Sequence, residues 1–400
     1  MGIESTEKKS DHQVNIVRLC EPRVHTNADT LELFDIGGYQ VVTKKGQFKE
    51  GDLAVYVQPD SVVPQTEAFR FIWGPYAEQE RGIISGEPFT PAVGERRRRI
   101  TVRRFRKEVS EGLLMPVTDF PEITQRYYDS GHPVEGEDVS DLIGVMHYEG
   151  DQDVEPTDGI NHNPKRKYPR TLKGWVYFVL YHLGFKGVRR NMNVELSFDV
   201  PKFDVENFKN HHTAIKDGED IIVTEKLHGS QARYIFKEGI MYAGSRNLWK
   251  DQDSPCVWRK ALQHNPWIEQ WCRMNEGCPL YGEVVPTQKG YSYGCKPGEV
   301  KFFVFDVRGI DGNYIPKKDL IHGNWGTPPR VAIFVPVLYE GPYNAEEIVK
   351  LVDGVSAVDG KTQREGIVIT ATDPTRWERG IGRVQLKWKS SAFLEKDGNR

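Results

Sequence analysis

The sequence predicts an α+β protein with two main domains, and three observations lead to this prediction. Short strands separated by glycine turns fill residues 14–147, which favours a small all-β barrel over an α/β unit. Beyond residue 200, short β segments recur, each with a charged residue at its end or on one face. Between these regions, residues 134–156 turn acidic and contain proline, as is typical of a domain boundary.

Composition limits the possible classes of protein. The net charge of −3 means that any contact with nucleic acid must come from local basic patches. No secretory signal is present, and the most apolar stretch, residues 175–185, is too short to span a bilayer. We therefore expect a soluble intracellular protein that is not associated with a membrane. Residues 1–6 fit the short pattern for myristoylation of Gly2, but the charged residues Glu4 and Lys8 make this match unconvincing, and the sequence leaves the modification open. The five cysteines form no CxxC pair and are expected to be reduced thiols without zinc: Cys20, Cys256, Cys272, Cys278 and Cys295.

The N-terminal region is expected to begin with disordered residues 1–13 and to continue as the barrel over residues 14–147. Strands are predicted at 15–18, 31–34, 39–42 and 52–57. The turns between them are predicted at Gly37, Gly38, Gly46 and Gly51. The long stretch 69–94 is expected to be disordered or to face RNA.

A basic cluster follows that stretch. It begins with four arginines, 96–99, for which a solvated loop and a phosphate-contacting patch are equally compatible readings. Apolar residues interleave with the next arginines, so part of the cluster is expected to be a strand with a basic face. We expect Arg103, Arg104 and Arg106 to contact nucleic acid.

Residues 148–195 are predicted to form a linker and a basic helical segment between the domains. An amphipathic helix is expected over residues 171–185. Contact with a duplex backbone and simple packing of this helix are equally compatible with the pattern. The residues that would contact nucleic acid are Lys165, Lys167, Arg189 and Arg190.

The C-terminal region is organised around Lys226. This lysine ends a short buried strand, residues 221–223, and Gly229 follows as a turn residue. Its ammonium group would lie over a pocket and act as a nucleophile if its pKa is lowered. Taken alone, such a pattern is more typical of a solvated lysine at a strand end.

Further charged and aromatic residues follow in order. Residues 301–308 are predicted to be a central strand, and Val384, Leu386 and Trp388 alternate with two lysines that should project from one face. The candidate site residues beyond Lys226 are Arg246, Glu283, Phe305, Glu365, Lys387 and Lys389.

Together these residue types suit a polyanion and a divalent metal ion. Cations hold a triphosphate and stabilise charge that develops during attack. Carboxylates such as Glu283 and Glu365 orient hydrated Mg²⁺ or Mn²⁺. Neighbouring cations and desolvation are expected to shift Lys226 towards its neutral, nucleophilic form.

The ordered motifs resemble those of covalent nucleotidyltransferases. They are Glu-Lys-Leu-His-Gly at 225–229, Ser-Arg-Asn at 245–247, Tyr-Gly-Glu at 281–283, Phe-Asp at 305–306, Glu-Gly-Ile-Val at 365–368 and Leu-Lys-Trp-Lys-Ser at 386–390. His228 stands where DNA ligases and capping enzymes usually have aspartate, and this resembles the RNA ligase branch related to phage T4 RNA ligase 2. Residues 25–33 resemble the opening of an OB fold, and an OB domain that precedes the ligase domain is similar to RNA ligases of the Deinococcus/Naegleria type.

The resemblance implies a fold and a reaction. The fold is an OB-type barrel followed by an ATP-grasp-like nucleotidyltransferase domain of antiparallel sheets and helices at 196–400. The reaction uses ATP and Mg²⁺ or Mn²⁺: lysyl-AMP forms, AMP passes to an RNA 5′-phosphate, and a 3′-OH then seals the strand. The expected substrate is a nicked duplex or an RNA–DNA hybrid, sealed by a monomer in RNA repair.

The resemblance also implies roles for residues. Lys226 is the nucleophile, His228 acts in the transfer of AMP to RNA, and Glu225 and Gly229 belong to the nucleotide site. The remaining roles are phosphate binding by Arg246, ribose and metal-water contacts by Glu283, adenine stacking by Phe305, metal-water orientation by Glu365, and α-phosphate contacts by Lys387 and Lys389.

Other classes remain as alternatives. A capping guanylyltransferase or a DNA ligase would share the lysine chemistry, but both usually carry an OB domain after the last motif, and the sequence ends at Arg400. A non-catalytic OB-fold RNA-binding protein is the alternative without chemistry. The intact motif side chains argue against it.

Overall fold

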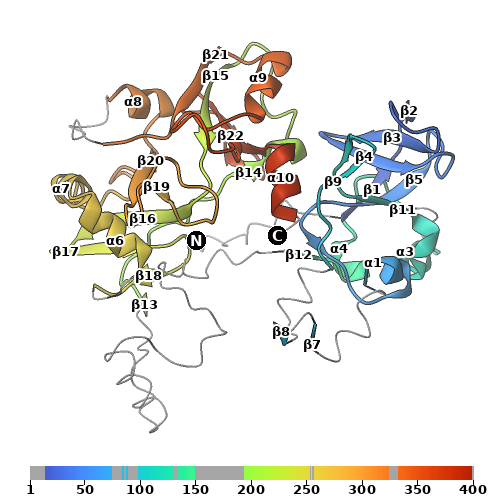
Figure 1. Cartoon of the computed structure of the whole chain (residues 1–400), viewed down its shortest axis with the longest axis horizontal. Helices are drawn as coiled ribbons and strands as arrows, with labels where there is room; N and C mark the ends of the chain where they lie inside the picture. The colour runs from blue at the N-terminus through green and yellow to red at the C-terminus, as the bar shows by residue number, and fades with distance from the viewer. Residues whose placement is uncertain are drawn as a thin grey trace, which may run out of the picture.

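The computed structural model describes residues 14–73, 83–84, 87–88, 98–128, 131, 133–148, 193–252, 254, 256–323 and 332–398. Figure 1 shows an N-terminal body in blue and teal beside a C-terminal body in green to red. The predictions for residues 1–13, for most of 69–94 and for the helix at 171–185 lie outside the described residues.

The N-terminal body is built from short antiparallel strands. One sheet has the order β1 (Val14–Arg18), β5 (Leu53–Val57), β11 (Leu113–Pro116), and another has β2 (Arg23–Val24), β3 (Leu31–Ile36), β4 (Tyr39–Lys44). Smaller pairs join β6 (Ser61–Val62) with β12 (Met146–His147), β7 (Ile83–Ile84) with β8 (Glu87–Pro88), and β9 (Arg103–Phe105) with β10 (Glu108–Ser110). The helices here are α1 (Arg70–Trp73), α3 (Pro121–Tyr127) and α4 (Ser140–Ile143).

Strand β5 lies between two cores. Ala54 and Tyr56 pack in one hydrophobic cluster, whereas Val55 and Val57 pack in another. Alternate side chains of a strand point to opposite faces, so β5 can be apolar throughout only because both faces are covered. The predicted turn glycine Gly51 has a φ of 86°, a conformation that favours glycine.

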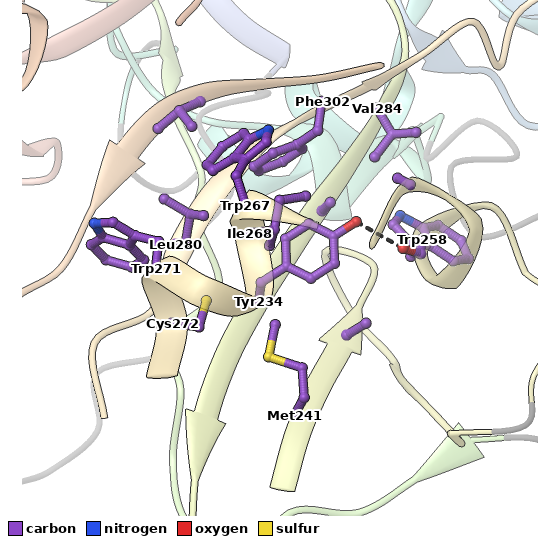
Figure 2. Packing of buried hydrophobic residues seen from close by; sticks show 14 of the residues in the cluster. Tyr234, Met241, Trp258, Trp267, Ile268, Trp271, Cys272, Leu280, Val284 and Phe302 are labelled. Atoms are coloured by element: carbon purple, nitrogen blue, oxygen red, sulfur yellow. Dashed lines mark hydrogen bonds between the residues drawn. The ribbon is translucent and has the colours of Figure 1, made fainter. Parts of the chain in front are cut away.

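The C-terminal body begins with a six-stranded sheet. Its order is β13 (Asn193–Val194), β18 (Trp249–Lys250), β17 (Ile240–Gly244), β16 (Ser230–Lys237), β19 (Leu280–Val285), β20 (Lys301–Val307). Helices α6 (Val257–His264) and α7 (Trp267–Met274) cover one face. Figure 2 shows their tryptophans against this face, where the Tyr234 hydroxyl donates to the Trp258 carbonyl at 2.8 Å.

The prediction that residues 301–308 form a central strand is wrong. β20 is the last strand of its sheet. It is nevertheless buried, because Val304 exchanges backbone hydrogen bonds with Ile333 and Val335 along its outer edge. That cover explains an aromatic, β-branched strand at the edge of a sheet.

A five-stranded sheet completes the C-terminal body. Its order is β14 (Glu206–Asn207), β25 (Gln385–Lys389), β22 (Gly366–Ala371), β15 (Asp220–Lys226), β21 (Val337–Pro342). The short β14–β25 pair is parallel, against the expectation of antiparallel sheets. Helix α9 (Ala345–Val352) packs on one face; α8 (Lys317–His322), β23 (Trp377–Glu378), β24 (Gly382–Arg383) and α10 (Ser391–Gly398) are the remaining elements.

Polar contacts join the two bodies. The Lys209 ammonium lies 2.5 Å from the Glu111 carboxylate, and this pair is nearly buried. The Arg104 Nε lies 2.6 Å from Glu395 Oε1 on α10, which lies between the bodies in Figure 1. Within the described residues, no helix has the length and apolar character needed to cross a membrane.

Candidate active site

Lys226 and Lys389 lie in one row across three neighbouring strands. Gly366 of β22 pairs with Lys226 of β15 on one side and with Lys389 of β25 on the other. Directly opposed residues of an antiparallel sheet share a face. The two lysines therefore project from the same face, and the central position of the row has no side chain.

The glycine in that row is required by packing. A Cβ built on Gly366 would lie 2.1 Å from the Trp388 carbonyl oxygen and 2.7 Å from the Lys389 Cα. Neither backbone atom can move without shifting β25. Glycine therefore keeps the two lysine-bearing strands at their observed separation.

The second lysine of β25 belongs to the next row. Lys387 pairs with Val368, which pairs with Thr224, so Lys387 projects from the same face as Lys389. The opposite face carries Leu386 and Trp388, which pack in the core beneath α9. The alternation expected for this strand is confirmed.

Glu365, immediately before β22, lies close to both Lys226 and His228. Its Oε1 lies 2.8 Å from Lys226 Nζ, and its Oε2 lies 3.5 Å from His228 Nδ1. Its side chain is 5% exposed, whereas Lys226 retains 25%. Burial alone would raise the pKa of Glu365, but the positive charges of Lys226, His228 and Lys389 hold that pKa well below its usual range.

The expectation of a lowered pKa for Lys226 is wrong. Burial does act to lower the pKa of this ammonium, but the negative charges of Glu365 and Glu283 outweigh burial and raise it. Carboxylates, and not cations, are thus the dominant neighbours. Lys226 is a protonated, ion-paired group until something neutralises those carboxylates.

Glu283 approaches the site from the six-stranded sheet. It pairs with Gln231 of β16, and its Oε1 accepts a hydrogen bond of 2.9 Å from the Gly229 backbone N–H. Burial raises the pKa of this carboxyl to about 8, although Lys226 opposes the shift. A Cβ on Gly229 would lie 2.3 Å from the Val284 carbonyl, so glycine permits this close approach.

Two carboxylates suit a divalent cation here. Glu365 Oε2 is buried and accepts no hydrogen bond from the described residues. Mg²⁺ and Mn²⁺ are commonly held by one or two carboxylates, with water and phosphate oxygens completing the coordination. In the parts of the chain that the structure describes, no cluster of three or more His, Cys, Asp or Glu side chains forms a ready-made metal site. The residues fit a cation that arrives with a phosphate ligand.

Arg246 and Phe305 both contact the segment before the five-stranded sheet. The Arg246 guanidinium lies 2.6 Å from Asp204, whose charge also acts on Lys226. The Phe305 ring lies 4.7 Å, centroid to centroid, from the Phe203 ring. An aromatic partner therefore already occupies part of the surface of Phe305.

The structure does not bring Glu225 to the same face as Lys226. Successive residues of β15 alternate, and the Glu225 carboxylate, 1% exposed, accepts a 2.7 Å hydrogen bond from the Ala357 N–H. Burial raises the pKa of this carboxyl. Its observed contact is with the loop before β22.

The basic residues of the N-terminal body behave differently from one another. Arg103, Arg104 and Arg106 are all exposed, and Arg104 is in addition paired with Glu395. Arg99, from the group of four arginines, is 13% exposed and bonded to Asp60. The candidate nucleic-acid contacts Lys165, Lys167, Arg189 and Arg190 lie outside the described residues.

An aromatic cage around His228 was not foreseen from the sequence. The ring lies 4.6 Å from that of Tyr291 and 4.8 Å from that of Phe393, both at steep angles. The backbone N–H of His228 donates to the Tyr293 hydroxyl at 2.7 Å. No spacing rule links these residues, because they come from a loop and from the C-terminal helix α10.

A buried charge cluster beside Phe305 was also missed. Asp306, 0% exposed, is bonded to Arg383 and lies 3.4 Å from the buried Lys317 ammonium. Lys317 also donates to the Phe305 carbonyl at 2.5 Å. Because Arg383 belongs to β24, the cluster ties the strand of Phe305 to the chain that leads into β25.

Comparisons with known proteins find similar domains and a similar fold. Residues 219–389 match the RNA ligase family model, and residues 13–117 match the PHA02142 OB-fold domain model. A structure of Naegleria gruberi RNA ligase with PPi has 24% identity and a TM-score of 0.66, covering 97% of this chain and 99% of that chain. A variant of that ligase with ATP and Mn has 22% identity and a TM-score of 0.66, covering 97% and 100%. At these identities the likeness is one of fold. A search of curated proteins found no match.

Proposed function

We propose that this enzyme is an ATP-dependent ligase that joins RNA 3′-OH and 5′-phosphate ends, because residues 219–389 match the RNA ligase family model and follow a region, 13–117, that matches an OB-fold domain model. The observation that carries the proposal is the row Lys226–Gly366–Lys389 with Glu365 at its edge. It combines a nucleophile, a second cation on the same face and a carboxylate within one small area.

Lys226 forms the first covalent intermediate. Its neutral amine attacks the α-phosphorus of ATP, a P–N bond forms, and the bond to pyrophosphate breaks. Lys389 and Lys387 project from the same face and contact the α-phosphate, where their charge stabilises the developing negative charge. The ammonium of Lys226 must first lose a proton, and neutralisation of the nearby carboxylates Glu365 and Glu283 would favour that loss by lowering the pKa of Lys226.

Glu283 and Glu365 are the carboxylates that would hold Mg²⁺ or Mn²⁺, whose charge would neutralise them and remove the main cause of the raised pKa of Lys226. The proposal also assigns the ribose to Glu283, a phosphate to Arg246 and the adenine to Phe305. The described structures with ATP and Mn belong to a ligase of the same fold, which supports this choice of nucleotide and metal.

Two transfers to RNA complete the reaction. An RNA 5′-phosphate oxygen displaces Lys226 from AMP, and a 3′-OH then attacks that 5′-phosphorus and releases AMP. His228 acts in the first of these transfers in our proposal. Its caged ring has Nδ1 3.5 Å from Glu365, so it can be held in one orientation beside the reacting phosphate.

The proposed substrate is a nick in an RNA duplex or an RNA–DNA hybrid, sealed by a monomer during RNA repair inside the cell. The OB-fold domain at 14–147 and the ligase domain at 196–400 would both contact the nucleic acid, with Arg103 and Arg106 offering exposed charge. The segment 148–195 would join them. All five cysteines are free thiols, which fits an intracellular protein.

One experiment tests the covalent step. The pure protein is incubated with [α-³²P]ATP and Mg²⁺ or Mn²⁺, and label on the protein is measured after denaturation. We expect label that is released by pyrophosphate. A wild-type protein that takes no label with either metal would overturn the proposal and favour a non-catalytic RNA-binding protein. In a parallel incubation with [α-³²P]GTP, label from GTP alone would favour a capping enzyme.

A second experiment tests the substrate. Sealing is compared on a nicked RNA duplex, a hybrid nick with an RNA 3′-OH strand, a DNA nick and single-stranded RNA. Sealing only where the 3′-OH strand is RNA supports the proposal. Efficient sealing of DNA, or a preference for single strands, contradicts it.

A further inference from the structure

We propose that Asp60, in the OB-fold domain, is a positioning residue that holds Lys389 of the ligase domain during the two RNA-directed steps. The inference rests on the proposed function, because it assumes that Lys389 contacts the reacting phosphate. Asp60 Oδ2 lies 4.0 Å from Lys389 Nζ across the boundary between the bodies. Among the candidate catalytic residues, Lys389 thus has a partner from the other domain.

Asp60 is held firmly on its own side of the boundary. Its N–H donates to the Ile100 carbonyl at 2.8 Å, and its carbonyl accepts from the Tyr148 N–H at 2.7 Å. Its φ is 69°, in the left-handed region that aspartate and asparagine tolerate better than most residues. The carboxylate therefore projects from a fixed turn between β5 and β6.

Asp60 presents its two oxygens to different cations. Arg99 donates to Oδ1 from Nε at 2.9 Å and from Nη2 at 2.6 Å. The Arg99 guanidinium also lies 4.5 Å over the Tyr148 ring, which fixes it from behind. Oδ2 remains directed towards Lys389, and both Arg99 and Lys389 lower the pKa of Asp60 against the effect of burial.

This arrangement explains why the Asp60 carboxylate, although negatively charged, need not prevent Lys389 from binding a phosphate. Arg99 offsets part of the Asp60 charge, so a bound phosphate experiences less repulsion from this pair than from a lone carboxylate. Lys389 has a flexible stem and is 31% exposed, so its orientation is costly in entropy. The ion pair reduces that cost by restricting the ammonium group before the phosphate arrives.

The effect should differ between the steps. In the first step, ATP brings three phosphates and can order Lys389 by itself. In lysyl-AMP and RNA-adenylate, AMP contributes a single phosphate, so a pre-oriented lysine matters more. The OB-fold domain thus contributes to the chemistry of the RNA steps, in addition to any contact that it makes with RNA.

The test compares Asp60→Asn with Glu111→Gln in the full-length protein. Asparagine keeps the shape and the left-handed backbone of Asp60 and removes only its charge. Glu111→Gln weakens another interdomain ion pair, in which the cation is Lys209 instead of Lys389. Thermal unfolding confirms that both variants are folded. Lysyl-AMP formation and single-turnover sealing by pre-formed lysyl-AMP are then measured at saturating nicked RNA.

We expect Asp60→Asn to slow single-turnover sealing about fivefold, with lysyl-AMP formation within about twofold of wild type. Glu111→Gln should raise the RNA concentration that is required for half-maximal sealing, without lowering the sealing rate at saturating RNA. The ratio of the wild-type sealing rate to the Asp60→Asn sealing rate should shrink towards one at about 1 M salt, where charge interactions are screened. A purely steric role of Asp60 would give equal sealing rates in wild type and Asp60→Asn at every salt concentration, because asparagine keeps the shape of aspartate.

Three results would overturn the inference while leaving the ligase proposal intact: wild-type sealing rates in Asp60→Asn, an equal fall of the plateau rate in Glu111→Gln, or an equal fall in lysyl-AMP formation. Failure of the ligase proposal is distinct, because the wild-type protein itself would then take no label from ATP.

Discussion

The Lys226 ammonium lies 2.8 Å from the Glu365 carboxylate, although 139 positions separate the two residues in the chain (365 − 226 = 139). The contact exists because β15 and β22 are neighbours and Lys226 pairs with Gly366. The ion pair holds the lysine in place and favours its protonated form. In the proposed reaction Lys226 is the covalent nucleophile, and it is therefore the residue to test first.

Lys226→Ala and Lys226→Arg should both abolish labelling of the protein by [α-³²P]ATP. Alanine lacks the amine, and the guanidinium of arginine does not lose its proton near neutral pH. Lys350→Ala is the matched control, because Lys350 is an exposed lysine of helix α9. Residual label in the Lys226 variants would assign the covalent bond to another residue.

Gly366→Ala should lower the free energy of unfolding by about 2–4 kcal/mol, measured by urea denaturation. The added Cβ would meet the Trp388 carbonyl at 2.1 Å and push β25 away from β22. Gly360→Ala is the comparison, because its Cβ meets nothing within 4 Å and only its φ of 66° is strained. That variant should lose about 1 kcal/mol. Equal losses in the two variants would argue against the steric explanation.

Asp306→Asn should destabilise the protein by about 3–5 kcal/mol, because it leaves the buried Lys317 ammonium without its anion. Burial already lowers the pKa of Lys317, against the effect of Asp306. Arg383→Met should cost less, about 1–2 kcal/mol, since Asp306 then keeps Lys317 as a partner. Urea denaturation of both variants gives the comparison. A larger loss for Arg383→Met would mean that the pairing of Arg383 with Asp306 contributes more to stability than the pairing of Lys317 with Asp306.

Phe393→Ala should slow the transfer of AMP to RNA about tenfold, because the His228 ring loses the neighbour 4.8 Å away and becomes free to turn. Lysyl-AMP formation should change less. Hydrogen exchange should also accelerate in α10, whose packing depends on this buried ring. Phe71→Ala is the control, since that ring is 60% exposed. Unchanged AMP transfer in a Phe393→Ala protein with a loosened α10 would show that the cage is dispensable.

Arg103→Ala should reduce the dependence of RNA binding on salt by about one unit of slope in a log–log plot, because an exposed arginine that contacts a phosphate releases one counterion. Arg104→Ala should have a smaller effect, since that guanidinium is paired with Glu395. Fluorescence anisotropy at several salt concentrations measures both slopes. A larger change in Arg104→Ala would mean that RNA displaces Glu395.

The strands and the chemical character of the site could be predicted from the sequence. Alternation in residues 384–390 placed Lys387 and Lys389 on one face, and the structure confirms it. Local patterns suffice for this, because a strand alternates its side chains whatever its neighbours are. The same reasoning failed for β20, whose burial comes from the later segment 333–335 and not from a central position in the sheet.

The sequence by itself determined which residue types are available and on which strand faces they lie: a strand-end lysine, two carboxylates and two lysines on one face. Tertiary structure alone decided which of them meet. The raised pKa of Lys226, the cage around His228 and the pairing of Asp60 with Lys389 depend on distances between strands and domains. Coulombic and packing energies change steeply over a few ångströms, and no local pattern specifies such distances between residues far apart in the chain.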